Sequence, residues 1–159
     1  MSNRSIVESL DNEFSSICDD TRLLVAFAFP KTDRAIPKPD REPNAWETVD
    51  IAWSICGLLS AAGNMITKKS GSVLMRGWSV DLPETATLLL DKLNEANKRR
   101  IKSFASLADE DLQRTFRDSE GEETAFGDQL ITLLTGGSRL LGRLYAHLQK
   151  TSDAPPPLI

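Results

Sequence analysis

Few side chains in this chain of 159 residues could carry out chemistry, and the single histidine, His147, is the first of them. It stands near the end of a predicted helix, where a lone imidazole is usually a surface group that faces the helix dipole. The two cysteines, Cys18 and Cys56, stand in separate segments, and buried free thiols are the simpler expectation than a disulfide. A zinc site takes at least three protein ligands, so we predict no metal and no cofactor.

The other candidates are cationic or aromatic. Arg139 and Arg143 stand four residues apart beside an apolar stripe, so they could meet an anion between helices. Such arginines more often reach solvent or pair with carboxylates of a neighbouring helix. Trp46 and Trp53 share one face of another predicted helix, where a core or dimer surface is the simpler interpretation than a stacking platform. The chain contains no Gly-rich phosphate loop, CxxC pair or HExxH motif, so its motifs name no reaction.

The elements that must position these residues are four long helices. Apolar residues recur at steps of three and four within residues 3–27, 45–68, 81–107 and 124–149, which predicts helices with one buried face. The longest stripe belongs to the last helix and comprises Phe126, Leu130, Leu133, Gly137, Leu140, Leu144 and Leu148. No stretch shows the alternation of a strand. We therefore predict an all-α protein, an antiparallel four-helix bundle with at most a short ribbon in a loop.

Local signals indicate where these helices begin and end. Four prolines between residues 29 and 44 predict a long, partly extended loop between the first two helices. Asn44, Asp81 and Thr124 are the expected N-caps of the second, third and fourth helices. Gly57 and Gly63 inside the second helix indicate close approach of a neighbouring backbone. The tail, residues 153–159, contains three consecutive prolines and cannot extend the last helix.

Length and charge restrict the class of protein. We predict a single domain over residues 1–159. A net charge of −4 and a pI near 5.1 argue against nucleic acid as a partner, and the basic cluster at residues 98–102 is more simply a solvated helix face. Residues 51–67 carry no charge, but they are few for a membrane span and rich in small residues, so we expect a core helix. No signal segment is apparent at the start, and we expect a cytoplasmic protein with no membrane partner.

Three stretches resemble the DinB/YfiT-like family of four-helix bundles. The first is Trp46-Glu47-Thr48-Val49-Asp50-Ile51, and the second runs from Leu93 to Phe104 and on through Leu107-Ala108-Asp109-Glu110-Asp111-Leu112. The third is Leu133-Leu134-Thr135-Gly136-Gly137-Ser138-Arg139-Leu140-Leu141-Gly142-Arg143-Leu144, followed by the proline-rich end. The resemblance implies a bundle that binds one divalent metal through three histidines, one on the second helix and a pair on the fourth, for thiol transfer or hydrolysis.

This chain departs from that family pattern at all three ligand positions. The helix-four pair falls on Gly136 and Leu140, and the helix-two ligand falls near Ser54. Glycine has no side chain and leucine no lone pair, so the vacated centre should hold no metal. We expect it to be mainly apolar, with any remaining pocket opening toward Gly136 and Ser54. The candidate pocket residues are Trp53, Ser54, Gly136, Arg139 and Leu140.

Three functional hypotheses follow. The leading one is a metal-free, DinB-like bundle without catalysis that binds a small ligand or acts through self-association. The first alternative is an enzyme with a relocated site between the second and fourth helices, for instance Cys56 or Ser54 with Arg139. The second is a pure protein-interaction module. We also expect a homodimer, because Trp46, Trp53 and Leu58 give the second helix more apolar surface than one core face uses.

Overall fold

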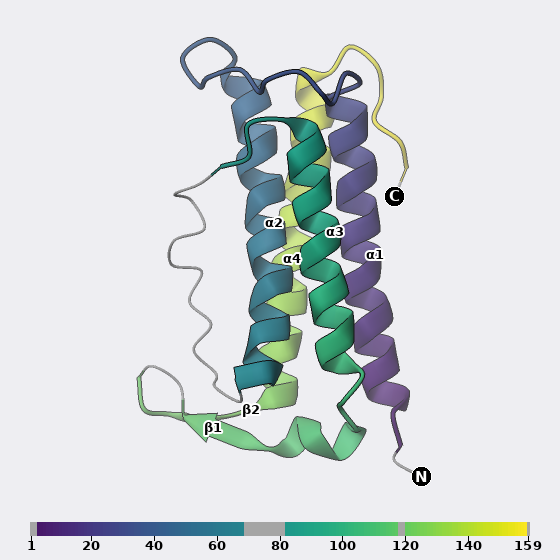
Figure 1. Cartoon of the computed structure of the whole chain (residues 1–159), viewed down its shortest axis with the longest axis vertical. Helices are drawn as coiled ribbons and strands as arrows, with labels where there is room; N and C mark the ends of the chain where they lie inside the picture. Colours follow the sequence, from purple (N-terminus) through teal and green to yellow (C-terminus); the bar gives the residue numbers. More distant parts are fainter. Residues whose placement is uncertain (1–2, 69–81, 118–119, 159) are drawn as a thin grey trace.

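The computed structural model describes residues 3–68, 82–117 and 120–158, and it confirms the predicted bundle (Figure 1). Its helices are α1 (Ser5–Ala28), α2 (Pro43–Lys68), α3 (Ala86–Phe104) and α4 (Phe126–Thr151). A 3-10 helix, η1 (Asp109–Gln113), and a ribbon of β1 (Thr115–Arg117) and β2 (Glu123–Ala125) join α3 to α4. The proline-rich segment after α1 forms the expected loop to α2.

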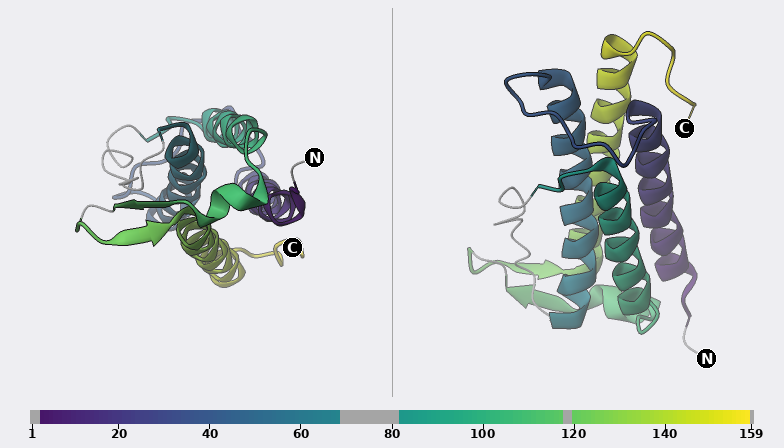
Figure 2. Two further views of the ribbon diagram at one scale, coloured as in Figure 1. Left: turned by 90° about the horizontal axis from the view of Figure 1, so that it is seen from below. Right: turned by 45° about the horizontal axis from the view of Figure 1, so that its top comes forward.

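The helices run up, down, down and up in chain order (Figures 1 and 2). Cys56 of α2 meets Lys92 of α3, and Thr67 meets Ser103, so both contacts join residues 36 positions apart in the sequence. A constant offset means that α2 and α3 run parallel. Neighbours α1 and α3 are antiparallel, as are α2 and α4, so the predicted antiparallel packing applies to those pairs.

Helix α2 is the centre of the core. Its apolar stretch Pro43–Thr67 is the one described helix that is long and apolar enough to cross a membrane, yet 78% of its most apolar window is buried inside the bundle. It packs most extensively against α3 and α4. Burial on several sides accounts for the absence of charge between residues 51 and 67.

Gly63 is a point of close approach between α2 and α3. A Cβ atom added there would lie 3.2 Å from the Cα atom of Arg100. This confirms the predicted close approach of backbones at Gly63, because only a residue without a side chain leaves room for that spacing.

The predicted N-caps of α2 and α4 were wrong, and the predicted N-cap of α3 lies outside the described residues. Helix α2 begins at Pro43, whose missing N–H costs nothing in a first turn, so Asn44 lies inside the helix. Helix α3 is capped by Thr85, whose hydroxyl accepts the N–H of Leu88 at 3.2 Å, while Asp81 lies outside the described residues. Thr124 pairs in the ribbon, and α4 begins after Ala125 without a side-chain cap.

Helices α1 and α3 cap each other. The Asp109 carboxylate, just beyond α3, accepts the backbone N–H groups of Val7 at 2.9 Å and Ile6 at 3.0 Å. In return, Arg4 donates to the carbonyls of Leu107 at 2.9 Å and Phe104 at 3.1 Å. These contacts satisfy end groups that neither helix can pair by itself.

Ionisation of Asp109 is part of this cap. Partial desolvation opposes ionisation, but the N–H groups of Val7 and Ile6 and the Ser5 hydroxyl stabilise the carboxylate, so the pKa of Asp109 lies below its usual value.

Candidate functional site

The five pocket candidates from the sequence do not gather around one cavity. Trp53 is 8% exposed and faces α3, while the half-buried Ser54 donates its hydroxyl to the Asp50 carbonyl at 2.9 Å. Arg139 is exposed, and Leu140 is half-buried against the core. None of the four main cavities in the described residues is lined by Ser54, Gly136, Arg139 or Leu140. Their role in ligand binding stays a prediction.

The space between α2 and α4 is filled by apolar side chains. A Cβ atom at Gly136 would lie 3.4 Å from Leu58 Cδ1. One at Gly137 would lie 3.2 Å from Ile17 Cδ1 and 3.3 Å from Leu58 Cδ2. Both glycines thus leave room for the Leu58 side chain, and α1, α2 and α4 pack tightly at Gly137.

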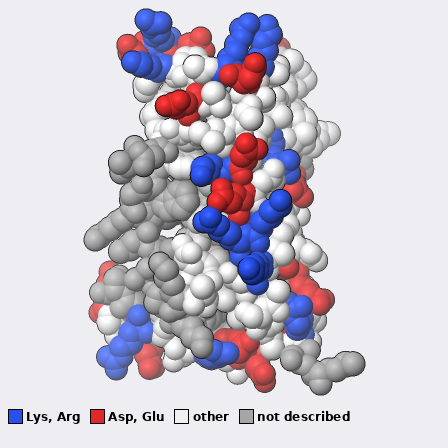
Figure 3. Space-filling model, viewed as in Figure 1, with Lys and Arg blue, Asp and Glu red and all other residues white. Residues whose placement is uncertain are grey.

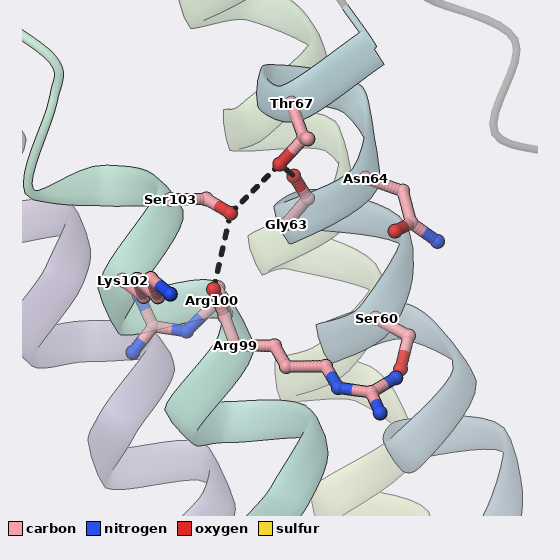
Figure 4. Close-up of a pocket in the computed structure, with 8 residues that line it drawn as sticks. All are labelled: Ser60, Gly63, Asn64, Thr67, Arg99, Arg100, Lys102 and Ser103. Atoms are coloured by element: carbon pink, nitrogen blue, oxygen red, sulfur yellow. Dashed lines mark hydrogen bonds between the residues drawn. The ribbon is translucent and has the colours of Figure 1, made fainter.

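The largest of these four cavities is instead a groove between the parallel helices α2 and α3, shown in Figure 4. It has a volume of about 510 Å³, within the range of small-molecule sites. Four residues of each helix line what we call the α2–α3 groove: Ser60, Gly63, Asn64 and Thr67 of α2, and Arg99, Arg100, Lys102 and Ser103 of α3. A smaller cavity continues it toward Trp53 and shares Ser60 and Arg99. Gly63 brings the two backbones close together at one point of the groove, and polar residues of both helices flank that point.

Two hydroxyl groups, one from each helix, contact each other across the groove. The hydroxyl oxygens of Thr67 and Ser103 are 3.0 Å apart. Thr67 also lies 3.1 Å from the Gly63 carbonyl, and Ser103 lies 3.0 Å from the Arg99 carbonyl (Figure 4). Two hydroxyl hydrogens serve these three contacts, so one contact is always without a hydrogen. Both hydroxyls can therefore turn toward a bound molecule, because the two carbonyls belong to helices that already supply them with N–H donors.

The groove is cationic. Its lining includes Arg99, Arg100 and Lys102 but no acidic residue. Arg99 pairs with Glu95 at 2.6 Å, and both side chains are well exposed to water. Lys102 forms no ion pair with any described residue. Figure 3 shows Lys and Arg side chains gathered near the middle of this face, with a few acidic side chains above them.

Arg100 was missed by the sequence analysis, which assigned residues 98–102 to a solvated face. Its side chain is 0% exposed, and it donates to Asp11 Oδ1 at 2.8 Å, Ser15 Oγ at 2.9 Å and Asn97 Oδ1 at 2.9 and 3.0 Å. Burial lowers the pKa of Arg100, and Asp11 acts against that shift. The signal was available, because Arg100 falls on the inner stripe seven residues after Leu93.

The guanidinium of Arg100 also packs against two aromatic rings. Its central carbon is 4.7 Å from the centroid of Phe104 and 5.3 Å from that of Phe14. Only the Arg100 main chain and stem thus border the α2–α3 groove, while its charge serves the contact between α1 and α3.

Both cysteines are buried free thiols, as expected. Cys18 donates to the Leu93 carbonyl at 3.6 Å, and Cys56 donates to the Lys92 carbonyl at 3.5 Å. Burial raises the pKa of Cys18 to about 11 and that of Cys56 to about 12. At neutral pH they are protonated and therefore poor nucleophiles.

His147 lies at the opposite end of α2 from the groove. Its Nε2 faces the Asn44 carbonyl at 2.9 Å, and its Nδ1 lies 3.4 Å from Glu47, which Arg143 also contacts at 3.3 Å. The pairing of Arg143 with a carboxylate of a neighbouring helix agrees with the simpler expectation for this residue. The histidine side chain is 9% exposed and joins α4 to the start of α2.

Among residues 3–68, 82–117 and 120–158, no three His, Cys, Asp or Glu side chains are grouped to hold a metal ion. Comparisons of the chain with protein-family models, curated proteins and solved structures found no match.

Proposed function

We propose that this four-helix protein is a non-catalytic binding protein, related to the DinB-like bundles, that takes a small ligand in the α2–α3 groove. The observation that carries the proposal is a groove of about 510 Å³ whose flanks present side-chain donors from both helices. Two of these side chains, Ser60 and Asn64, form no hydrogen bond to any described residue, so their polar groups are available to a ligand.

Among the described residues that line the groove, no nucleophile stands beside a base, and this favours binding over reaction. Nucleophilic catalysis needs a nucleophile with an adjacent base. The His147 imidazole lies at the far end of α2, and Cys56 beside the groove has a pKa raised to about 12. The alternative enzyme, with a site between α2 and α4, is disfavoured because Leu58 fills that space against Gly136 and Gly137.

Self-association receives little support from the residues that suggested it. Trp53 and Leu58 are 8% and 4% exposed within a single chain, and Trp46 is half-buried. Their apolar surface is therefore used by the bundle itself, so we favour the ligand-binding hypothesis over the homodimer and the interaction module.

A ligand panel with a blocked groove tests this function. Asn64→Trp places an indole at an exposed position of the lining, while Ser138→Trp places one at an exposed position of α4, away from the groove. We expect at least one compound from a panel of small anionic, neutral and cationic molecules to raise the melting temperature of the wild type and of Ser138→Trp but not of Asn64→Trp. Stabilisation that survives in Asn64→Trp, or no stabilisation by any compound, would refute the proposal.

A further inference from the structure

We infer that the α2–α3 groove selects small molecules that carry a phosphate group. This inference rests on the proposed binding function and specifies its ligand class. Although the chain has a net charge of −4, three basic residues and no acidic residue stand among the described residues that line the groove.

The basic side chains around the groove act against the field of the helix backbones. Helices α2 and α3 are parallel, so both carboxyl ends lie near the groove, each equivalent to about −0.5 charge. The Arg100 guanidinium is neutralised by Asp11 on the other side of α3. Arg99 is likewise paired, with Glu95 at 2.6 Å, so an arriving anion must displace that carboxylate before Arg99 and Lys102 act together against about one unit of negative dipole charge.

The donors match a phosphate in geometry as well as in charge. Arg99 has a planar fork of five N–H donors, of which the contact with Glu95 uses one nitrogen, Nη2. Figure 4 shows the Arg99 side chain reaching across the groove toward Ser60 of α2. A phosphate held there would meet the Arg99 fork beside the Ser60 hydroxyl, while the Lys102 ammonium and the hydroxyls of Thr67 and Ser103 belong to the rest of the lining. A phosphate monoester, with a charge of −1.5 to −2 near neutral pH and three acceptor oxygens, fits this set of donors.

The Glu95 carboxylate opposes the binding of a phosphate. It contacts Arg99 at 2.6 Å and Lys92 at 3.7 Å, so an arriving phosphate competes with this carboxylate for Arg99. The pair is exposed and weak, and a ligand of higher charge should displace it. Removing the Glu95 charge should therefore strengthen phosphate binding, whereas removing the charge of Arg99 or Lys102 should weaken it.

Isothermal titration of the full chain with ribose 5-phosphate and with ribose tests the inference. We expect ribose 5-phosphate to bind and ribose not to bind. Arg99→Gln and Lys102→Gln should each weaken binding about three- to tenfold, and Glu95→Gln should strengthen it about two- to fivefold. Lys98→Gln is the matched control, because Lys98 is an exposed cation of α3 that does not line the groove, and its affinity should equal that of the wild type.

The outcomes separate this inference from the function on which it rests. Equal weakening by Lys98→Gln and Arg99→Gln would indicate attraction by overall charge and overturn the phosphate site. A neutral or cationic compound that binds in the groove, with no binding of ribose 5-phosphate, would leave the binding function standing and overturn the ligand class. Co-sedimentation with vesicles containing phosphatidic acid, without binding of ribose 5-phosphate, would assign the phosphate chemistry to a membrane surface and overturn the small-molecule ligand.

Discussion

Replacing Asp11 by alanine should destabilise this protein more than replacing its partner Arg100 by methionine. The Arg100 side chain is 0% exposed, whereas the Asp11 side chain is 27% exposed. Alanine at position 11 would leave a buried guanidinium without its counter-charge, packed against two aromatic rings and with no solvent exposure. A carboxylate left without Arg100 could still turn toward solvent, so the two halves of the pair are unequal.

The structure places the size of these effects within a narrow range. Removing one partner of a buried pair costs about 3–5 kcal/mol. The Ser15 hydroxyl, the Asn97 amide oxygen and the main-chain carbonyl of residue 11 remain as acceptors, so we expect Asp11→Ala to lie at the lower end, about 3 kcal/mol. For a chain of this length that lowers the melting temperature by about 6–12 °C. Arg100→Met keeps an apolar stem against the rings and should cost about 1–2 kcal/mol.

Urea denaturation followed by circular dichroism measures both free energies of unfolding. The double variant Asp11→Ala/Arg100→Met should be no less stable than Asp11→Ala alone, because the unpaired buried charge is gone. Asp50→Ala serves as the control, since Asp50 is exposed and forms no ion pair with a described residue, and it should stay within about 0.5 kcal/mol of the wild type. If Asp11→Ala costs less than about 0.5 kcal/mol, or less than Arg100→Met, the reasoning from unequal burial is wrong.

Four further predictions concern single residues. Gly142→Ala should stabilise the protein by about 0.5–1 kcal/mol because the added Cβ atom would meet nothing within 4 Å. Gly63→Ala should destabilise it because the added Cβ atom would lie 3.2 Å from the backbone of α3. Thermal melts that show equal effects for the two variants would contradict the close approach at Gly63. The sequence alone placed Leu140 in the centre of the bundle, where truncation to alanine costs about 2–5 kcal/mol. Because the side chain is half-buried in the structure, we expect Leu140→Ala to cost about 1–2 kcal/mol. A loss below about 0.5 kcal/mol in a denaturation experiment would place this side chain in solvent. Because the folded-state pKa of Asp109 is lowered, its contribution to stability is present above the unfolded-state pKa of about 3.9 and is lost as pH falls through the folded-state value. Melting temperatures measured from neutral pH down to acid should therefore fall more steeply for the wild type than for Asp109→Asn, and parallel curves would exclude this role. Cys56 should react with a thiol reagent at mildly alkaline pH only after urea is added, since burial raises its pKa to about 12, and rapid labelling of the native protein would contradict that burial.

The sequence by itself determined the local elements. Steps of three and four in the apolar residues are sufficient to define an amphipathic helix, so all four long helices were predicted close to their observed bounds. Prolines remove backbone donors wherever the chain folds, so the loop after α1 was equally predictable. Gly63 was identified as a point of close approach because a helix keeps a glycine, at a cost of about 1 kcal/mol relative to alanine, mainly where packing needs the space.

Only the tertiary structure decided which helices are neighbours and in which direction they run. An apolar stripe shows that a helix has a partner but does not identify it, so the parallel pairing of α2 with α3 could not be read from the sequence. The α2–α3 groove depends on that pairing, because it brings residues 60–67 beside residues 99–103. The same holds for the burial of Arg100 and the capping by Asp109, whose partners lie 89 and 102–103 positions away along the chain. Local spacing carries no information about contacts at such distances, and the candidate site is built from these contacts.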